Sequence, residues 1–156
     1  CPLDLHCTYT RDQLLVALDF MKPSTVREGV KWLPEKNIDV FFVTLNKADK
    51  DYSPTTMYND YSINESLFHW QSQSTTAENS PTGQRYIHHK ERGSKVLLFV
   101  REFKADRVTG GAETYTYLGT ARYVKHEGSR PMNITWQLDR PIPAKFLKKT
   151  NKLVVG

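Results

Sequence analysis

The stretch that decides the fold is Ile38–Leu45, which reads IDVFFVTL. Its residues are mostly β-branched or aromatic, and such residues favour a β-strand. Because the apolar residues follow one another without regular polar alternation, we expect a central strand buried on both faces. A second stretch of the same kind, Val96–Phe103 (VLLFVREF), predicts another strand.

More strands are expected outside this pair. Tyr115–Val124 predicts a strand with a bulge or bend at Gly119, and Met132–Leu138 predicts another. Tyr86–His89 is expected to form a short strand after the polar loop Ser74–Gln84.

A shorter strand is expected at Phe68–Ser72. Side chains alternate between the two faces of a strand, so Phe68 and Trp70 should share one face. His69 and Gln71 should lie on the other.

Helices are expected mainly in the first third of the chain. Thr10 and Gln13 fit a capping box ahead of an apolar run, and Pro23 should end that helix. Ser53–Tyr58 predicts a short helix with Pro54 in its first turn, and Ala144–Lys149 a marginal terminal turn.

Strands dominate the last two-thirds of the chain, with helices segregated before them. This order predicts an α+β fold: one domain, residues 1–156, with a curved, mostly antiparallel sheet or β-barrel flanked by a few helices. The chain opens with Cys1-Pro2 and no methionine, which suggests a fragment of a longer protein.

Charge and cysteine content narrow the function classes. Lys and Arg total 22 against 17 acidic residues, a formal charge of +5 that favours polyanionic partners. The two cysteines form no CxxC pair, which is typical of a reducing compartment and argues against structural zinc. No apolar run approaches the ~20 residues of a membrane helix, so we expect no membrane partner.

Catalytic patterns are weak. His88-x-Lys90 lacks the downstream aspartate of phospholipase D-type phosphodiesterases, and no G-x-S-x-G motif occurs. Glu102-x-Lys104 matches half of a metal-dependent nuclease site, although a solvated strand end explains it more simply. The histidines show no metal-ligand spacing, so no catalytic residue, metal or cofactor is expected here.

The informative stretch is Lys47–Trp70, where aromatic residues mix with amides, hydroxyls and a carboxylate. Aromatic rings stack on bases, and acceptors can read a base edge. The residues expected to form a base pocket are Tyr52, Ser53, Pro54, Tyr58, Asp60, Tyr61, Trp70 and Gln71. Those expected to bind phosphates are Arg27, Lys31, Lys47, Arg85, His88 and Lys90. Alternatively, these aromatic residues pack in the core under a helix and the basic residues form a solvated surface, and the composition is equally compatible with this interpretation.

Motifs along nearly the whole chain resemble one known module. They are Leu5–His6, Tyr9–Asp12, Arg27–Val30, Asp39–Lys47, Tyr52–Tyr58, Leu67–Ser74, Thr82–Tyr86, Leu98–Glu102, Tyr117–Gly119 and Arg130–Met132. The module is the C-terminal domain of unknown function of bacterial superfamily II helicase-like proteins. Many of those proteins also carry a phospholipase D-type nuclease.

The resemblance has functional implications. In modification-dependent restriction enzymes of that architecture, this domain is similar to the base-flipping methylcytosine readers, with an SRA/PUA-like barrel core. It implies a non-catalytic reader of double-stranded DNA in the bacterial cytoplasm. ATP, magnesium and cleavage would then belong to helicase and nuclease domains of the same chain, acting in phage defence.

Within that resemblance, we expect a modified cytosine to rotate into a pocket walled by Tyr58, Tyr61 and Trp70, with Asp60 accepting from its amine. Two rival hypotheses remain. The domain could read a phosphorothioate linkage against Tyr52 and Pro54, or it could be a coupling module that docks on the parent helicase or nuclease without touching DNA.

Overall fold

The computed structural model describes residues 5–9, 13, 29–46, 60–103 and 114–150. Within these residues, eight strands form one sheet, in the order β2-β3-β6-β7-β8-β5-β4, with β1 also pairing with β7. The elements are β1 (Thr8–Tyr9), β2 (Val30–Leu33), β3 (Ile38–Asn46), β4 (Tyr61–Ser62), β5 (Leu67–Gln71), α2 (Pro81–Ile87), β6 (Lys95–Phe103), β7 (Tyr115–Glu127), β8 (Asn133–Leu138) and α3 (Ala144–Thr150).

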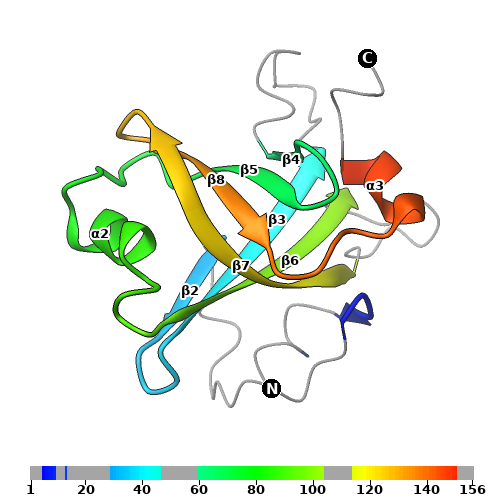
Figure 1. Ribbon diagram of the computed structural model, residues 1–156, viewed down its shortest axis with the longest axis horizontal. Helices are drawn as coiled ribbons and strands as arrows, with labels where there is room; N and C mark the ends of the chain where they lie inside the picture. The colour runs from blue at the N-terminus through cyan, green and yellow to red at the C-terminus, as the bar shows by residue number, and fades with distance from the viewer. Residues whose placement is uncertain (1–4, 10–12, 14–28, 47–59, 104–113, 151–156) are drawn as a thin grey trace.

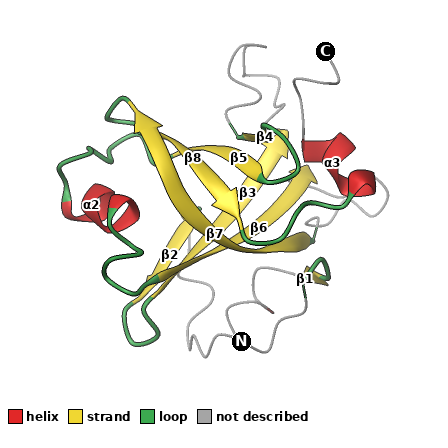
Figure 2. Cartoon of the chain, in the orientation of Figure 1, coloured by secondary structure: helices red, strands yellow, loops and turns green. Residues whose placement is uncertain are grey.

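The sheet is curved and open, and it confirms the α+β prediction. Strands β3 and β6 run parallel, while the other described pairs are antiparallel. Strands β2 and β4 lie at its two edges, so the barrel alternative is not met by the described residues. Figure 2 shows the two short helices α2 and α3 to the left and right of the sheet, and both pack against the same hydrophobic cluster.

Strand β3 is central, as its continuous apolar run predicts. Phe41, Val43 and Leu45 enter one hydrophobic cluster, which also contains Trp70, Tyr86 and Trp136. Val40 and Phe42 point the other way and enter a second cluster with Leu97 and Phe99 of β6. Both faces of the β3–β6 pair are therefore buried, which explains why the polar alternation is missing.

Strand β7 bends because it holds two irregularities. The register with β6 shifts between Leu98 and Phe99, opposite Gly119, whose φ of +91° suits glycine. The register with β8 shifts between Tyr123 and Lys125, which leaves Val124 as an extra residue. Figure 1 shows β7 as a long curved strand that crosses the sheet. The bend predicted at Gly119 is confirmed.

The structure corrects the expectations for residues 74–89. Instead of a loop to Gln84 and a strand at Tyr86–His89, residues Pro81–Ile87 form helix α2. Ser80 is its N-cap and accepts from the Gly83 N–H at 3.1 Å, with Pro81 following in the first turn. Tyr86 is completely buried and holds the helix against the sheet.

The other expectations have mixed outcomes. The strands predicted at Phe68–Ser72 and Met132–Leu138 are confirmed as β5 and β8, and the terminal turn forms α3. Edge strand β2 was not predicted. The helices expected at Thr10–Pro23, except Gln13, and at Ser53–Tyr58 lie outside the described residues.

The core cluster gives a stability prediction. Phe41 stacks on Trp70 with ring centroids 4.2 Å apart and meets the edges of Tyr86 and Trp136. Phe41→Ala should therefore lower the free energy of unfolding by about 3 to 5 kcal/mol in urea denaturation. Ile63→Ala is the control, since that side chain is 37% exposed, and it should change stability by less than about 0.5 kcal/mol. Equal losses for both variants would contradict this account of the core.

Candidate nucleic-acid interface

One face of β7, β8, β5 and β4 carries polar side chains in register. Residues opposite each other in an antiparallel pair point to the same side of the sheet. One row runs from Lys125 through Thr135 and His69 to Tyr61, because these residues pair directly across the four strands. We call this outward side the polar face; its residues are Tyr61, Leu67, His69, Gln71, Arg122, Lys125, Glu127, Asn133, Thr135 and Gln137.

An aromatic stack lies at the β4–β5 end of the polar face. The rings of Tyr61 and His69 stack with centroids 4.7 Å apart and an interplanar angle of 13°. Both side chains are partly exposed. A flat pair of this kind offers a π-surface on which a nucleobase can stack.

A carboxylate and two amides lie together at the end of β5. Asp60 is 4% exposed, and its Oδ1 accepts from the Gln71 backbone N–H at 2.8 Å. The Gln71 side-chain amide donates to Asn133 Oδ1 on β8 at 3.3 Å. Carboxylates and amides can read the donor and acceptor edge of a base.

An open depression adjoins the polar face beside α3, with a volume of about 620 Å³. It is lined by Asn64, Glu65, Ser66, Leu67, Gln137 and Leu147. Because it is open to solvent, it does not by itself enclose a ligand as a binding pocket would.

Of the residues predicted for the base pocket, Tyr61 and Gln71 lie on the polar face, and the Asp60 carboxylate accepts the Gln71 backbone N–H. Trp70 points away from them. Its ring is 4% exposed and stacks on Phe41 inside the core, on the opposite side of β5. Adjacent residues of a strand cannot share a face, so the placement of Trp70 in the wall of the same pocket as Gln71 needs correction. Tyr52, Ser53, Pro54 and Tyr58 lie outside the described residues, and their role stays a prediction.

The described candidates for phosphate binding lie on the side of the sheet near β2 and α2 (Figure 1). They are Lys31 on β2, Arg85 in α2, and His88 and Lys90 just after it. Lys90 is exposed, and His88 Nδ1 lies 3.4 Å from Glu91 Oε1. Arg27 and Lys47 lie outside the described residues. Phosphate binding by this set stays a prediction.

Arg85 has a structural partner. Its Nε and Nη2 donate to Asp39 Oδ2 and Oδ1 at 2.8 and 2.9 Å, a bidentate ion pair. Its guanidinium also lies over the Trp32 ring, 4.6 Å from the centroid. The Asp39 carboxylate is completely buried, and burial raises its pKa although Arg85 opposes that effect. The geometry therefore ties Arg85 to the fold.

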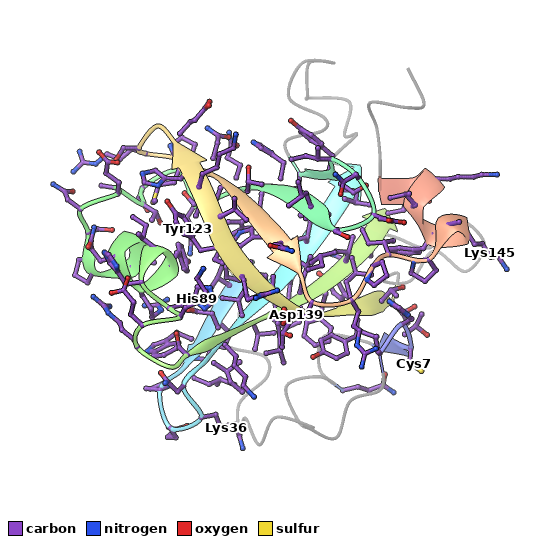
Figure 3. The ribbon with its side chains drawn as sticks, in the orientation of Figure 1. Cys7, Lys36, His89, Tyr123, Asp139 and Lys145 are labelled. Carbon is purple, nitrogen blue, oxygen red and sulfur yellow. The ribbon has the colours of Figure 1, made fainter. Side chains whose placement is uncertain are left out.

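His89 is a buried histidine to which the sequence pattern gave no role. Its Nδ1–H donates to the Ser94 carbonyl at 3.1 Å, and its Nε2 accepts the Tyr123 backbone N–H at 3.0 Å. These partners define a neutral tautomer, and burial lowers the pKa of His89. Figure 3 shows His89 beside β7, below Tyr123.

The described residues hold neither a metal-ligand cluster nor a membrane-spanning helix. In that part of the chain, no group of three or more His, Cys, Asp or Glu side chains is arranged to hold a metal ion. Lys104, the partner expected for Glu102 in a nuclease site, lies beyond it. None of the helices described is both long and apolar enough to cross a bilayer.

The sequence matches one family. The model of a family described as Domain of unknown function (DUF3427) matches residues 3–149. Because the match covers nearly the whole chain, the protein belongs to this family. No curated protein matches the sequence.

Three solved structures are similar at low identity. One is the DNA recognition domain of the cytosine modification-dependent restriction endonuclease LpnPI: TM-score 0.42, 10% identity, covering 72% of this chain and 60% of that one. A second is the 5-hydroxymethylcytosine-specific restriction enzyme AbaSI, with a TM-score of 0.37 and 15% identity; the match covers 74% of this chain and 32% of that one. A third is the DNA modification-dependent restriction endonuclease AspBHI, with a TM-score of 0.49 and 13% identity; the match covers 94% of this chain and 46% of that one. The chain thus spans a third to three-fifths of their lengths.

The Asp39–Arg85 pair gives a second prediction. Arg85→Met removes the partner of a buried carboxylate and should lower the free energy of unfolding by about 3 to 5 kcal/mol. Lys90→Met removes an exposed cation from the same region and should change stability little. Chemical denaturation measures both, and a stable Arg85→Met protein would show that Arg85 is dispensable to the fold.

His89 gives a pH prediction. Folding lowers the pKa of His89. As pH falls through about 6.5, the unfolded chain therefore takes up a proton on this histidine while the folded chain still keeps it neutral. The stability contributed by neutral His89 is therefore complete above pH 6.5 and is lost on acidification. The free energy of unfolding, measured from pH 7.5 to 5.5, should fall less steeply in His89→Gln than in the wild type. Parallel profiles would rule out this titration.

Proposed function

We propose that this domain binds double-stranded DNA and recognises a modified cytosine in it, as the target-recognition part of a modification-dependent restriction system. The observation that carries the proposal is the polar face. It places a partly exposed aromatic stack, a carboxylate–amide group and basic side chains on one rigid sheet. Each is a chemistry that DNA readers use: stacking for bases, acceptors and donors for base edges, cations for phosphates.

The division of labour follows from charge and geometry. Lys125 and the exposed Lys90 would neutralise phosphates and supply affinity independent of sequence, which falls with salt. Asp60, Tyr61 and Gln71 would contact the base itself, with Asp60 accepting from the cytosine amine. A buried methyl group contributes only about 0.8 kcal/mol, so polar contacts must supply part of the discrimination.

We infer that the target cytosine is flipped out of the duplex to reach these residues. A carboxylate that is 4% exposed cannot meet the amine of a stacked, paired cytosine without such a rotation. The residues between Asn46 and Asp60 precede β4 directly, and the predicted Tyr52 and Tyr58 would complete the walls of the pocket.

The family resemblance of the sequence is the basis for a proposal about further domains of a longer parent protein. We propose that the parent chain carries a helicase and a nuclease, which would use ATP and magnesium in the bacterial cytoplasm. In this proposal the present domain is a reader without a cofactor or catalytic residue of its own, and cleavage of foreign DNA happens elsewhere in the chain.

A competition titration at one salt concentration tests the proposal. The duplexes differ only in carrying cytosine, methylcytosine, hydroxymethylcytosine or a phosphorothioate linkage. We expect a preference of at least ten-fold, about 1.4 kcal/mol, for one of the modified cytosines. Preference for the phosphorothioate duplex would mean that the domain reads that linkage instead of a modified cytosine. Equal binding to all four duplexes would indicate a DNA-binding domain without preference for a modification. No binding would indicate a coupling module that does not contact DNA.

Two variants test the division of labour. Gln71→Ala should reduce the preference while leaving the affinity for unmodified DNA nearly unchanged. Lys125→Ala should weaken every duplex alike and reduce the salt slope by about one. Lys145→Ala on α3, far from the β7–β8 turn in Figure 3, is the charge-matched control and should have little effect. Equal losses for Gln71→Ala on all duplexes would disprove the base contact.

A further inference from the structure

The outward side of the sheet carries basic side chains beyond the polar face. Arg122 of β7 belongs to that face and lies opposite Gln137 of β8. On its other side β7 pairs with β6, where Val96 lies opposite Ala121, and both of these side chains are buried in the hydrophobic cluster. The next residue on each strand, Lys95 and Arg122, therefore points outward. The polar face thus continues from β7 onto Lys95 at the start of β6.

Two turns lie beside Lys95 and add further cations. They are the β2–β3 turn, which contains Lys36, and the turn before β6, which contains Arg92. The Asn37 carbonyl accepts the Lys95 N–H at 3.0 Å, and the Asn37 side-chain amide donates to the Arg92 carbonyl at 3.2 Å. These bonds hold the two turns together at one end of the sheet. Figure 3 shows Lys36 at this end and Lys145 of α3 at the other side of the molecule.

The exposed cations form a series that runs from β7 to the two turns. We call it the basic path; its residues are Lys125, Arg122, Lys95, Arg92 and Lys36. Lys90 and Arg140 are further exposed cations beside it. The Asp139 carboxylate lies 2.8 Å from Arg122 Nε. Basic residues outnumber the acidic residues close to the path, which are Glu35, Glu91, Glu127 and Asp139. The positive excess suits a polyanionic ligand.

The spacing of the path matches a nucleic-acid backbone. A strand rises by about 3.3 Å per residue and neighbouring strands lie about 4.8 Å apart, so the backbone positions of Lys125 and Lys95 are separated by roughly 10 Å. Duplex DNA rises by about 3.4 Å per base pair on each strand, so this separation corresponds to about three base-pair steps. Long basic side chains at such intervals can each meet a different phosphate of one strand.

We propose that the DNA backbone follows the basic path away from the target base, so that the domain holds the phosphates on one side of that base. The inference rests on the proposed function and adds a direction to it. Tyr61 and Gln71 mark the target base near β4 and β5, and the path leads from β7 toward the β2–β3 turn. Arg92 and Lys95 bind phosphates there and contribute affinity without reading sequence.

Salt dependence of binding tests the path. We would titrate the 156-residue chain with the preferred duplex at several salt concentrations. The double variant Arg92→Gln/Lys95→Gln should weaken modified and unmodified duplexes alike, and the slope of log K against log salt should become shallower by about 1.8, which is two phosphate contacts. Lys145→Gln/Lys148→Gln removes two exposed cations from α3 and is the charge-matched control, which should keep the wild-type slope.

Shortened duplexes test the direction. Base pairs are removed from one end and then from the other, with the target base kept. Wild-type protein should lose affinity mainly on one side, and the Arg92→Gln/Lys95→Gln protein should show little loss on either. If wild-type protein binds DNA but both ends matter equally, or if the double variant keeps the wild-type slope, the path is wrong and DNA binding stands. If wild-type protein binds no duplex, the proposed function and the path both fall.

Discussion

The structure depends on the contact between Phe41 and Trp70. Their stacked rings join the centre of the sheet, β3, to strand β5 near its edge, across the interior of the curve. Tyr86 from α2 and Trp136 from β8 close around the pair with edge-on contacts. Four rings from four elements are thus packed together, and the polar face is rigid because the opposite side of β5 and β8 is filled by this cluster.

Much of the sheet was readable from the sequence. The sequence predicts β3, β6 and β5 correctly because burial leaves a recognisable pattern. A strand buried on both faces is a continuous apolar run, as in β3 and β6, whereas a strand buried on one face alternates, as in β5. Helix α2 was missed since seven residues are too few for a helical period to show. Its signal was local, a Ser80–Pro81 start equivalent to the one recognised at Ser53–Pro54.

The site was predicted less completely. Tyr61 and Gln71 lie on the polar face, whereas alternation along β5 assigns Trp70 to the opposite face. Arg85 shows the same difficulty: nothing near it in the sequence reveals that Asp39, 46 positions earlier, is buried beneath its guanidinium. Such long-range pairs depend on topology, and composition cannot supply them.

The hydrogen bond from the Tyr123 backbone N–H to His89 affects how readily another chain can pair with the exposed edge of β7. Past Ala121, β7 has no strand beside it on the α2 side, and an uncovered strand edge invites another chain to pair with it. The imidazole takes up one backbone N–H of that edge, and α2 packs alongside. A buried side chain thereby occupies one of the backbone groups that an added strand would need at this edge.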